Sequence, residues 1–220
     1  MIMVQHGSIL AFLETLYTPL VSDVMDKLGI KNQVLDHSIQ SMIFDPHLKI
    51  AGYAFPCRVI PTEEYVEIDT LLEMVDAIPN DSVVLVASDS DIDAALWGGL
   101  MSTRASARGA KAAIVNGGVR DIEQITDLGF PVFGSYRCVK DIRKRGFMSH
   151  YNCEIVIGNV VVKPLDIVFS DINGIVAIPS DRLDEILSSL KTTLENEQQT
   201  MSELSEGKSA REVFETYKTF

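Results

Sequence analysis

The fold is decided by residues 83–136, VVLVASDSDIDAALWGGLMSTRASARGAKAAIVNGGVRDIEQITDLGFPVFGSY. Three apolar runs in this stretch, at 83–88, 111–118 and 131–136, are typical of buried strands. A loop and a helix that ends at Gly109 separate the first two runs, and a helix at 119–129 separates the last two. Strands that alternate with helices in this way predict a parallel sheet and an α/β fold.

The residues before this stretch predict two helices and then a β-region. Residues 8–17 have the spacing of a short amphipathic helix. Thr18-Pro19 predicts a second helix that runs to Gly29, with Thr18 as N-cap and Pro19 as the first helical residue. After a loop over 30–50, LKIAGYAFPCRVIP at 48–61 predicts two strands separated by a glycine turn or bulge, and 63–78 predicts a helix.

The last third of the chain has a different pattern. Apolar stretches between Asn152 and Pro179, interrupted by Gly158, Pro164 and Asn173-Gly174, predict antiparallel hairpins with Asn-Gly as a tight turn. Residues 181–220 predict a long helix, a break at Gly207 and a short helix. We therefore expect an α/β domain over residues 1–180 and a helical extension over 181–220 that packs on a neighbouring subunit.

Composition narrows the classes of function. The chain has 220 residues, of which 46% are hydrophobic, and this suits one globular domain with appended helices. With 31 acidic and 19 basic side chains, the net charge is −12, which disfavours contact with nucleic acid. Such a charge suits a divalent cation or a basic protein segment, or it serves solubility alone.

Cysteine usage and hydropathy predict the compartment. The three cysteines form no CxxC pair, and the start of the chain has neither a basic region nor a cleavage site. We therefore expect a reducing, cytoplasmic setting. No run of about 18 apolar residues is present, so we expect no contact with a membrane.

Two glycine-rich turns carry the functional prediction. Trp97-Gly98-Gly99-Leu100 and Asn116-Gly117-Gly118-Val119 both lie between a strand and a helix, and Arg120-Asp121 follows the second turn. At neighbouring strand ends, such turns form a crevice whose exposed N–H groups bind carboxylates or phosphates. Arg120 offers a planar cation, and Asp121 offers a hard oxygen ligand for Mg²⁺ or Mn²⁺. The plainer alternative makes the glycines helix caps and Arg120-Asp121 an exposed ion pair.

This segment resembles the RraA-like family, which includes class II 4-hydroxy-4-methyl-2-oxoglutarate/4-carboxy-4-hydroxy-2-oxoadipate aldolases and regulators of ribonuclease E activity. The family motif is a glycine or acidic residue, twenty residues, and then Arg-Asp; Gly99 and Arg120-Asp121 stand at that spacing. Weaker matches cover most of the remaining chain, at SDVMDKLG (22–29), AGYA (51–54), PLDIVFSDINGIVAIP (164–179), and Glu197 followed by Gly207.

The resemblance implies a swivelling β/β/α-type domain that forms a trimer or a hexamer, with a site between subunits. It implies that the backbone at Gly98, Gly99, Leu100 and Met101 and the Arg120 side chain hold an α-keto acid. By the same resemblance, Asp121 is the direct ligand of Mg²⁺ or Mn²⁺, and Glu197 of a neighbouring subunit contacts the water shell of the metal.

One position departs from the family pattern. Family members with glycine at the first motif position usually carry an acidic residue three after the aspartate, where this chain has Gln124. The acidic residue here is Glu123, which points elsewhere on a helix. Gln124 is therefore expected to support the metal's water shell without adding charge.

Two functions follow from the resemblance. The first is a metal-dependent pyruvate lyase that cleaves 4-hydroxy-4-methyl-2-oxoglutarate and decarboxylates oxaloacetate, with Arg120 stabilising the enolate. The second is a regulator without catalysis, whose acidic surface binds a basic segment of a ribonuclease. Oxaloacetate decarboxylation distinguishes the two, because loss of CO₂ yields the enolate directly and needs no further base.

Overall fold

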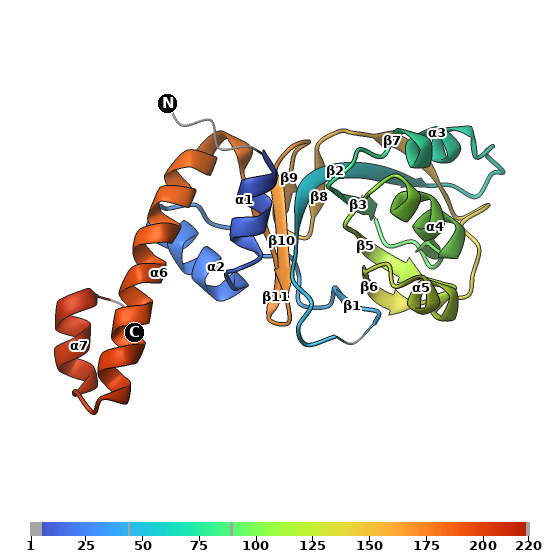
Figure 1. Ribbon diagram of the computed structural model, residues 1–220. Coiled ribbons are helices and arrows are strands. Elements are labelled where there is room, and N and C mark those ends of the chain that lie inside the picture. The colour runs from blue at the N-terminus through green and yellow to red at the C-terminus, as the bar shows by residue number, and fades with distance from the viewer. Residues whose placement is uncertain (1–5, 44, 89, 219–220) are drawn as a thin grey trace.

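The computed structural model describes residues 6–43, 45–88 and 90–218 (Figure 1). Within these ranges, nine strands form one mixed sheet in the order β1-β6-β5-β3-β2-β10-β11, with β4 beside β5 and β7 beside β2. The sheet strands are β1 (Gln40–Ser41), β2 (Ile50–Pro61), β3 (Ser82–Ser88), β4 (Ala95–Trp97), β5 (Ala112–Val119), β6 (Val132–Arg137), β7 (Gly146–Tyr151), β10 (Ile167–Asp171) and β11 (Gly174–Ile178). A separate antiparallel pair consists of β8 (Ile155–Ile157) and β9 (Val160–Val162).

The predicted parallel block is confirmed. Strands β2, β3, β5 and β6 pair in parallel, because helical crossovers return the chain to the same end of the sheet each time. Helices α3 (Asp69–Ala77), α4 (Gly99–Ala107) and α5 (Ile122–Leu128) supply these connections and cover one face of the sheet (Figure 1). Gly129 ends α5 in the left-handed conformation, as its position after Leu128 predicts.

The prediction of a turn within residues 48–61 is wrong, because Ile50–Pro61 is one continuous strand. Its backbone pairs with β3 on one side and with β10 and then β7 on the other, so Gly52 lies in a regular ladder. The absence of a side chain at Gly52 permits close packing, since an added Cβ would lie 2.9 Å from the Asp81 carbonyl oxygen. The register shift in this strand comes later, between Arg58 and Val59.

Several smaller predictions also need correction. The helix expected over 63–78 is shorter, and the strands β1, β4 and β7 are additions to the sequence prediction, β1 within the loop expected over 30–50. β1 and β4 have only two and three residues, which is too short for a strand pattern to be recognised. The tight turn of the last hairpin consists of Ile172 and Asn173, because Asp171 pairs with Gly174. Thr18 is the first residue of α2 and not its N-cap, because its hydroxyl is used in a tertiary contact.

A second helical layer covers the other side of the β10–β11 hairpin (Figure 1). It consists of α1 (His6–Leu13), α2 (Thr18–Lys27) and the first half of α6 (Leu183–Ser205), whose Ile186 and Leu190 are buried against the apolar side chains of α2 and β10. After the predicted break at Gly207, α7 (Ala210–Tyr217) folds back on α6, and Ser209 and Glu212 form a capping box at its start. The far half of α6 and α7 extend away from the body of the domain (Figure 1).

Membrane insertion finds no support in these helices. In the part of the chain that the structure describes, no helix combines the length and the apolar character that crossing a bilayer requires.

A buried carboxylate joins the second helical layer to the sheet. Asp171, at the end of β10, accepts hydrogen bonds from the backbone N–H and the hydroxyl of Thr18, at 2.8 and 2.7 Å. Its Oδ1 also accepts the Asn173 backbone N–H at 2.8 Å, which shapes the hairpin turn. Burial opposes ionisation of Asp171, but these hydrogen bonds outweigh it and lower the pKa below the ordinary value of 3.8.

This contact predicts a component of acid sensitivity. Because the pKa of Asp171 is lower in the folded state, its stabilisation is present above about pH 4 and is lost as the pH falls through the folded-state pKa. We expect Asp171→Asn to lower the free energy of unfolding at pH 7 by about 1–3 kcal/mol and to flatten its dependence on pH below 5. Urea unfolding at a series of pH values measures both effects.

Asp26→Asn is the matched control, since Asp26 is an exposed carboxylate on α2. The control variant should keep the wild-type pH dependence. An Asp171→Asn curve parallel to that of wild type between pH 3 and 5 would show that Asp171 is not a source of the acid sensitivity.

Candidate functional site

The first glycine-rich turn meets Arg120-Asp121 because two parallel strands end at the same level. The second predicted turn, Asn116-Gly117-Gly118-Val119, is instead the last part of strand β5, so the chain turns only after Val119. Trp97 at the end of β4 pairs with Val119 at the end of β5, and the Arg120 N–H donates to the Trp97 carbonyl oxygen at 3.1 Å. Gly98-Gly99 and Arg120-Asp121, which are more than twenty residues apart in the chain, therefore follow directly from paired positions. A hollow opens beside Arg120-Asp121 at these strand ends, but the residues that line it do not include the Gly98-Gly99 turn.

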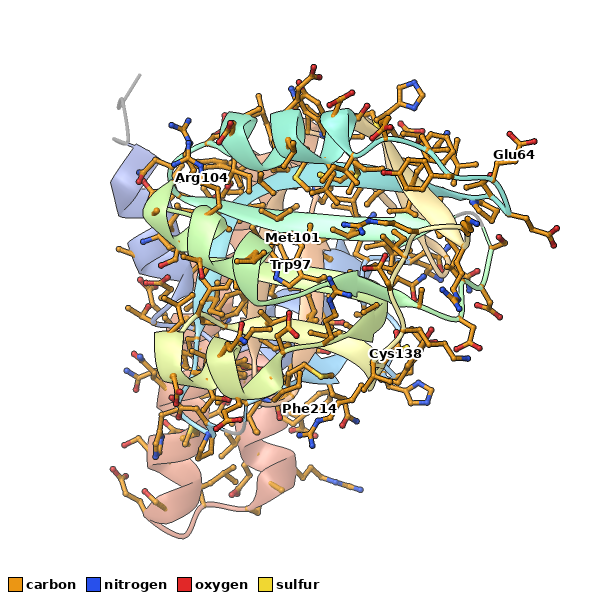
Figure 2. The ribbon with its side chains drawn as sticks, turned by 90° about the vertical axis from the view of Figure 1, so that its right-hand side faces the viewer. Glu64, Trp97, Met101, Arg104, Cys138 and Phe214 are labelled. Carbon is orange, nitrogen blue, oxygen red and sulfur yellow. The ribbon has the colours of Figure 1, made fainter. Side chains whose placement is uncertain are left out.

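Trp97 fixes the first turn against α4. Its ring is buried, and its Nε1–H donates to the hydroxyl of Ser102 at 2.8 Å. That hydroxyl in turn donates to the Gly98 carbonyl oxygen at 3.1 Å, so the side chains hold the backbone before the helix. Figure 2 shows Trp97 and Met101 together at one end of α4, with Arg104 toward the other end.

Asp121 has a backbone conformation unusual for a residue with a side chain. Its φ of 59° and ψ of 39° are left-handed, which Asp tolerates better than most residues and which is found often at functional sites. In this conformation its Oδ2 accepts the Gly99 N–H, the first backbone donor of α4, at 3.0 Å. The carboxylate therefore lies at the positive end of a helix, where negative charge is stabilised.

Gly98 and Gly99 are required by the space available. A Cβ at Gly98 would lie 2.7 Å from Asp121 Oδ2 and 3.1 Å from Arg120 Cγ. A Cβ at Gly99 would collide with Gln124 Oε1 and would lie 3.2 Å from the Asp121 Cβ. Every side chain larger than hydrogen would thus displace the groups that form the site.

Arg120 lies between two carboxylates. Its Nε is 3.7 Å from Asp121 Oδ2, and its Nη1 donates to Asp141 Oδ2 at 3.2 Å. The Arg143 backbone N–H, which donates to Asp141 at 2.8 Å, is the main cause that lowers the pKa of Asp141; burial opposes the shift, and Arg120 adds to it. Asp141 therefore stays ionised and holds the guanidinium in place. Sequence reasoning missed Asp141, because no motif or spacing in its neighbourhood marks it.

The structure brings most of the predicted site residues together. Gly98, Gly99, Arg120, Asp121 and Gln124 are mutual neighbours through the contacts described above. Leu100 and Met101 belong to the first turn of α4, where backbone N–H groups have no partner within the helix. The Leu100 side chain is 85% exposed, so the mouth of the site is open beside it.

Glu197 does not join this cluster within one chain. It belongs to α6, on the opposite side of the β10–β11 hairpin from α4 and α5 (Figure 1). Burial raises the pKa of its carboxyl. The expected approach of Glu197 to the metal therefore depends entirely on a neighbouring subunit.

The oxygen donors at the site suit a hydrated magnesium-type ion. In the described ranges no three His, Cys, Asp or Glu side chains come together as a metal cluster, so a cage made only of protein ligands is not available. Mg²⁺, however, is usually held by one or two carboxylates and several waters. Asp121 provides one carboxylate, and Gln124 Oε1 lies beside Gly99, next to the Asp121 Cβ. These donors fit such an ion.

A hollow of about 490 Å³ opens next to Arg120 and Asp121. Its other lining residues are Val119, Ile122, Arg137, Cys138 and Val139. Figure 2 shows Cys138 on the side of the domain toward which the Trp97 end of α4 points. The hollow therefore combines apolar walls with two guanidinium groups and one carboxylate, a lining suited to a small organic anion.

Known proteins resemble this chain in sequence and in fold. DlpA of Legionella pneumophila is 29% identical over 200 residues, which are 90% of this chain, although the chain spans only 32% of that protein. A Halalkalibacterium halodurans protein provisionally named a 4-hydroxy-4-methyl-2-oxoglutarate aldolase is 26% identical over 80% of this chain and 79% of its own length. The structure of RraAS2 from Streptomyces coelicolor, an unusual member of the RNase ES inhibitor RraA family, superposes with a TM-score of 0.78. It covers 92% of this chain and 97% of that one at 19% identity, which shows the fold alone.

A family model supports the same relationship over most of the chain. The model, described as Aldolase/RraA, matches residues 18–177, a range that contains Gly98-Gly99, Arg120-Asp121 and Asp141. The fold expected from the resemblance is confirmed, with helices α6 and α7 appended after the matched region. The chain belongs to the RraA-like family.

Proposed function

We propose that this protein is a divalent-metal-dependent lyase that forms the enolate of pyruvate. It acts as a 4-hydroxy-4-methyl-2-oxoglutarate aldolase with oxaloacetate decarboxylase activity. The observation that carries this proposal is the placement of the Asp121 carboxylate 3.7 Å from the Arg120 guanidinium, at the first turn of α4. The aldolase name of the Halalkalibacterium relative agrees with it.

Substrate binding begins at the start of α4. The exposed N–H groups of Leu100 and Met101 bind the carboxylate of the α-keto acid, aided by the dipole of the helix. Gly98 and Gly99 let the side chains of Arg120, Asp121 and Gln124 lie directly against this backbone, since no Cβ stands in the way.

Arg120 stabilises the charge that develops on the keto oxygen. Because Asp141 and Asp121 hold its guanidinium from two sides, little reorganisation is needed when the enolate forms. Asp121 and Gln124 would hold Mg²⁺ or Mn²⁺, which supplies Lewis-acid polarisation of the substrate oxygens when bound. In oxaloacetate decarboxylation, the carbon–carbon bond to the leaving CO₂ breaks and its electron pair becomes the enolate, so no additional base is required.

The site is completed by a second subunit in this proposal, within a homotrimer or a hexamer. Glu197 lies on a helix that extends away from its own domain, and the apolar Met201 and Phe214 on the same extension are 70% and 47% exposed. Leu100 and Val139, 85% and 94% exposed, offer apolar surface at the mouth of the site. Packing of the extension on a neighbouring domain would bury surfaces of both kinds.

The second candidate function is a regulator that binds a basic protein segment of a ribonuclease. The net charge of −12 and the neutral Gln124 at the position where the family pattern has an acidic residue are compatible with it. Pyruvate release from oxaloacetate with and without Mg²⁺ or Mn²⁺ separates the two functions. Metal-dependent release supports the lyase, and its absence at every metal concentration supports the regulator.

Asp121→Asn should reduce metal-dependent decarboxylation to the level of the metal alone. The amide oxygen can still accept the Gly99 N–H, so the melting temperature should stay near that of wild type, while the charge that binds the cation is lost. Asp127→Asn, which changes an exposed carboxylate on the same helix α5, is the control and should keep full activity. If Asp121→Asn kept the wild-type rate, Asp121 would not be the ligand of the metal.

Arg120→Lys should lower kcat by about 10²–10³-fold and change KM much less. A lysine is a point charge and cannot contact Asp141 and the enolate together through a planar fork, so the loss falls on the transition state. Steady-state decarboxylation at saturating metal measures both constants. If only KM changed, Arg120 would bind the substrate without stabilising the enolate.

Gln124→Glu should lower the metal concentration that gives half-maximal activity by about ten-fold. A carboxylate next to Gly99 adds attraction for the dication where the wild-type amide adds none, so the wild type should require unusually high Mg²⁺ or prefer Mn²⁺. Glu123→Gln is the control: it removes the charge of the residue next to Gln124 and should leave the dependence of activity on metal concentration unchanged. Coincident curves for Gln124→Glu and wild type would show that position 124 does not sense the metal.

A further inference from the structure

Positive charge is concentrated in one short segment that no step above uses. Residues 137–145, RCVKDIRKR, contain five of the 19 basic side chains of a chain whose net charge is −12. The segment directly follows β6, the strand that pairs with β5 and its terminal Arg120-Asp121. A basic segment at the edge of the candidate site implies that something besides the keto-acid group is recognised there.

Most of these basic side chains already have partners. Lys140 pairs with Asp93, and Arg143 lies 3.9 Å from Asp141. The Arg145 Nη1 donates to the Asp141 carbonyl oxygen at 3.0 Å. Among the residues that the structure describes, Arg137 and Lys144 form no ion pair. These two are the cations in the segment that an external anion can engage without displacing a carboxylate.

Only one of these two side chains lies at the hollow of the site. Arg137 is the last residue of β6, its position pairs with Val119, and it lines the 490 Å³ hollow together with Arg120 and Asp121. Lys144 lines a different hollow, with Asp91, Asp93 and Glu63. Arg137 is exposed, so a ligand in the hollow can reach its guanidinium.

We propose that Arg137 is a specificity-determining residue that binds a second anionic group on the substrate, a carboxylate in the first place. This inference rests on the proposed function, whose substrates already carry a distal carboxylate, and it names the residue that recognises that group. Arg120 is committed to Asp141 and to the enolate oxygen, so a distal carboxylate in the hollow would otherwise meet only apolar walls and the carboxylate of Asp121. The planar fork of Arg137 can bind such a group through two parallel hydrogen bonds.

The test compares two inhibitors that differ in the distal group. Oxalate mimics the enolate and has no distal carboxylate, whereas 2-oxoglutarate carries one. Their inhibition constants in metal-dependent decarboxylation are measured for wild type, Arg137→Gln and Arg137→Lys. Protection of each protein from thermal unfolding by each ligand, at fixed Mg²⁺, supplies a readout that does not depend on turnover.

Arg137→Gln should weaken 2-oxoglutarate by ten-fold or more and oxalate by less than about two-fold, in line with the loss of one charge-assisted contact. Arg137→Lys should recover part of the affinity. The phosphonate analogue 4-phosphono-2-oxobutanoate, which has the same chain length as 2-oxoglutarate, shows whether the hollow prefers a phosphate-like group to a carboxylate. Weaker binding of 2-oxoglutarate or of this analogue by Arg137→Gln supports the proposal.

Lys144→Gln is the matched control, since it removes the same charge from the same segment but away from the hollow. It should leave the affinity for 2-oxoglutarate within about two-fold of wild type. The role of Arg137 would be overturned if Arg137→Gln and Lys144→Gln weakened the binding of 2-oxoglutarate equally. It would also be overturned if Arg137→Gln weakened the binding of oxalate as much as that of 2-oxoglutarate. If wild type binds oxalate normally and 2-oxoglutarate no better than Arg137→Gln does, the specificity proposal fails and the lyase stands. If wild type binds neither ligand, the lyase proposal fails too.

Discussion

One hydrogen bond ties the two halves of the candidate site together, from the Gly99 N–H to the carboxylate of Asp121. It requires that β4 and β5 end in register, that residue 121 turn into the left-handed region, and that residues 98 and 99 have no side chain. Neighbouring side chains and turns maintain these features. The buried Trp97 fixes one strand end, and the left-handed turn at Asp121 starts α5 and directs the carboxylate back toward α4.

The arrangement of charge around Arg120 gives the site its chemical character. Without a carboxylate partner, Arg120 would be repelled by a cation bound beside it. If Asp121 were its only partner, the charge of Asp121 would be used to neutralise the guanidinium. Here Asp141 holds the guanidinium from one side, so Asp121 keeps an oxygen available at the start of α4. Arg137 at the end of β6 lines the hollow, and Asp141 in the loop that follows orients the Arg120 guanidinium, so one short segment contributes to both.

Local sequence pattern was sufficient for the centre of the fold and for the centre of the site. The apolar runs at 83–88, 111–118 and 131–136 are strong strand signals, and parallel strands must end at a common edge, so the meeting of Gly99 with Asp121 could be predicted. Arg137 could not, because only the register of β6 on β5 brings it to this edge, and Asp141 could not, because it lies in the loop after β6 and is placed by its contact with Arg120. The continuous strand through Gly52 was missed for the same reason, since pairing on both sides decides it. The proposed approach of Glu197 to a metal would need a neighbouring subunit, so neither the sequence pattern nor the fold of one chain can position it.

The contact between Gly99 and Gln124 also links substitutions at these two positions. The space that a side chain at position 99 would need is occupied by the Oε1 atom of Gln124. A residue with a Cβ at position 99 would therefore require Gln124 to adopt another side-chain rotamer or to be replaced by a shorter residue. The effect of a substitution at position 99 thus depends on which residue is at position 124, although twenty-four residues separate the two positions in the chain.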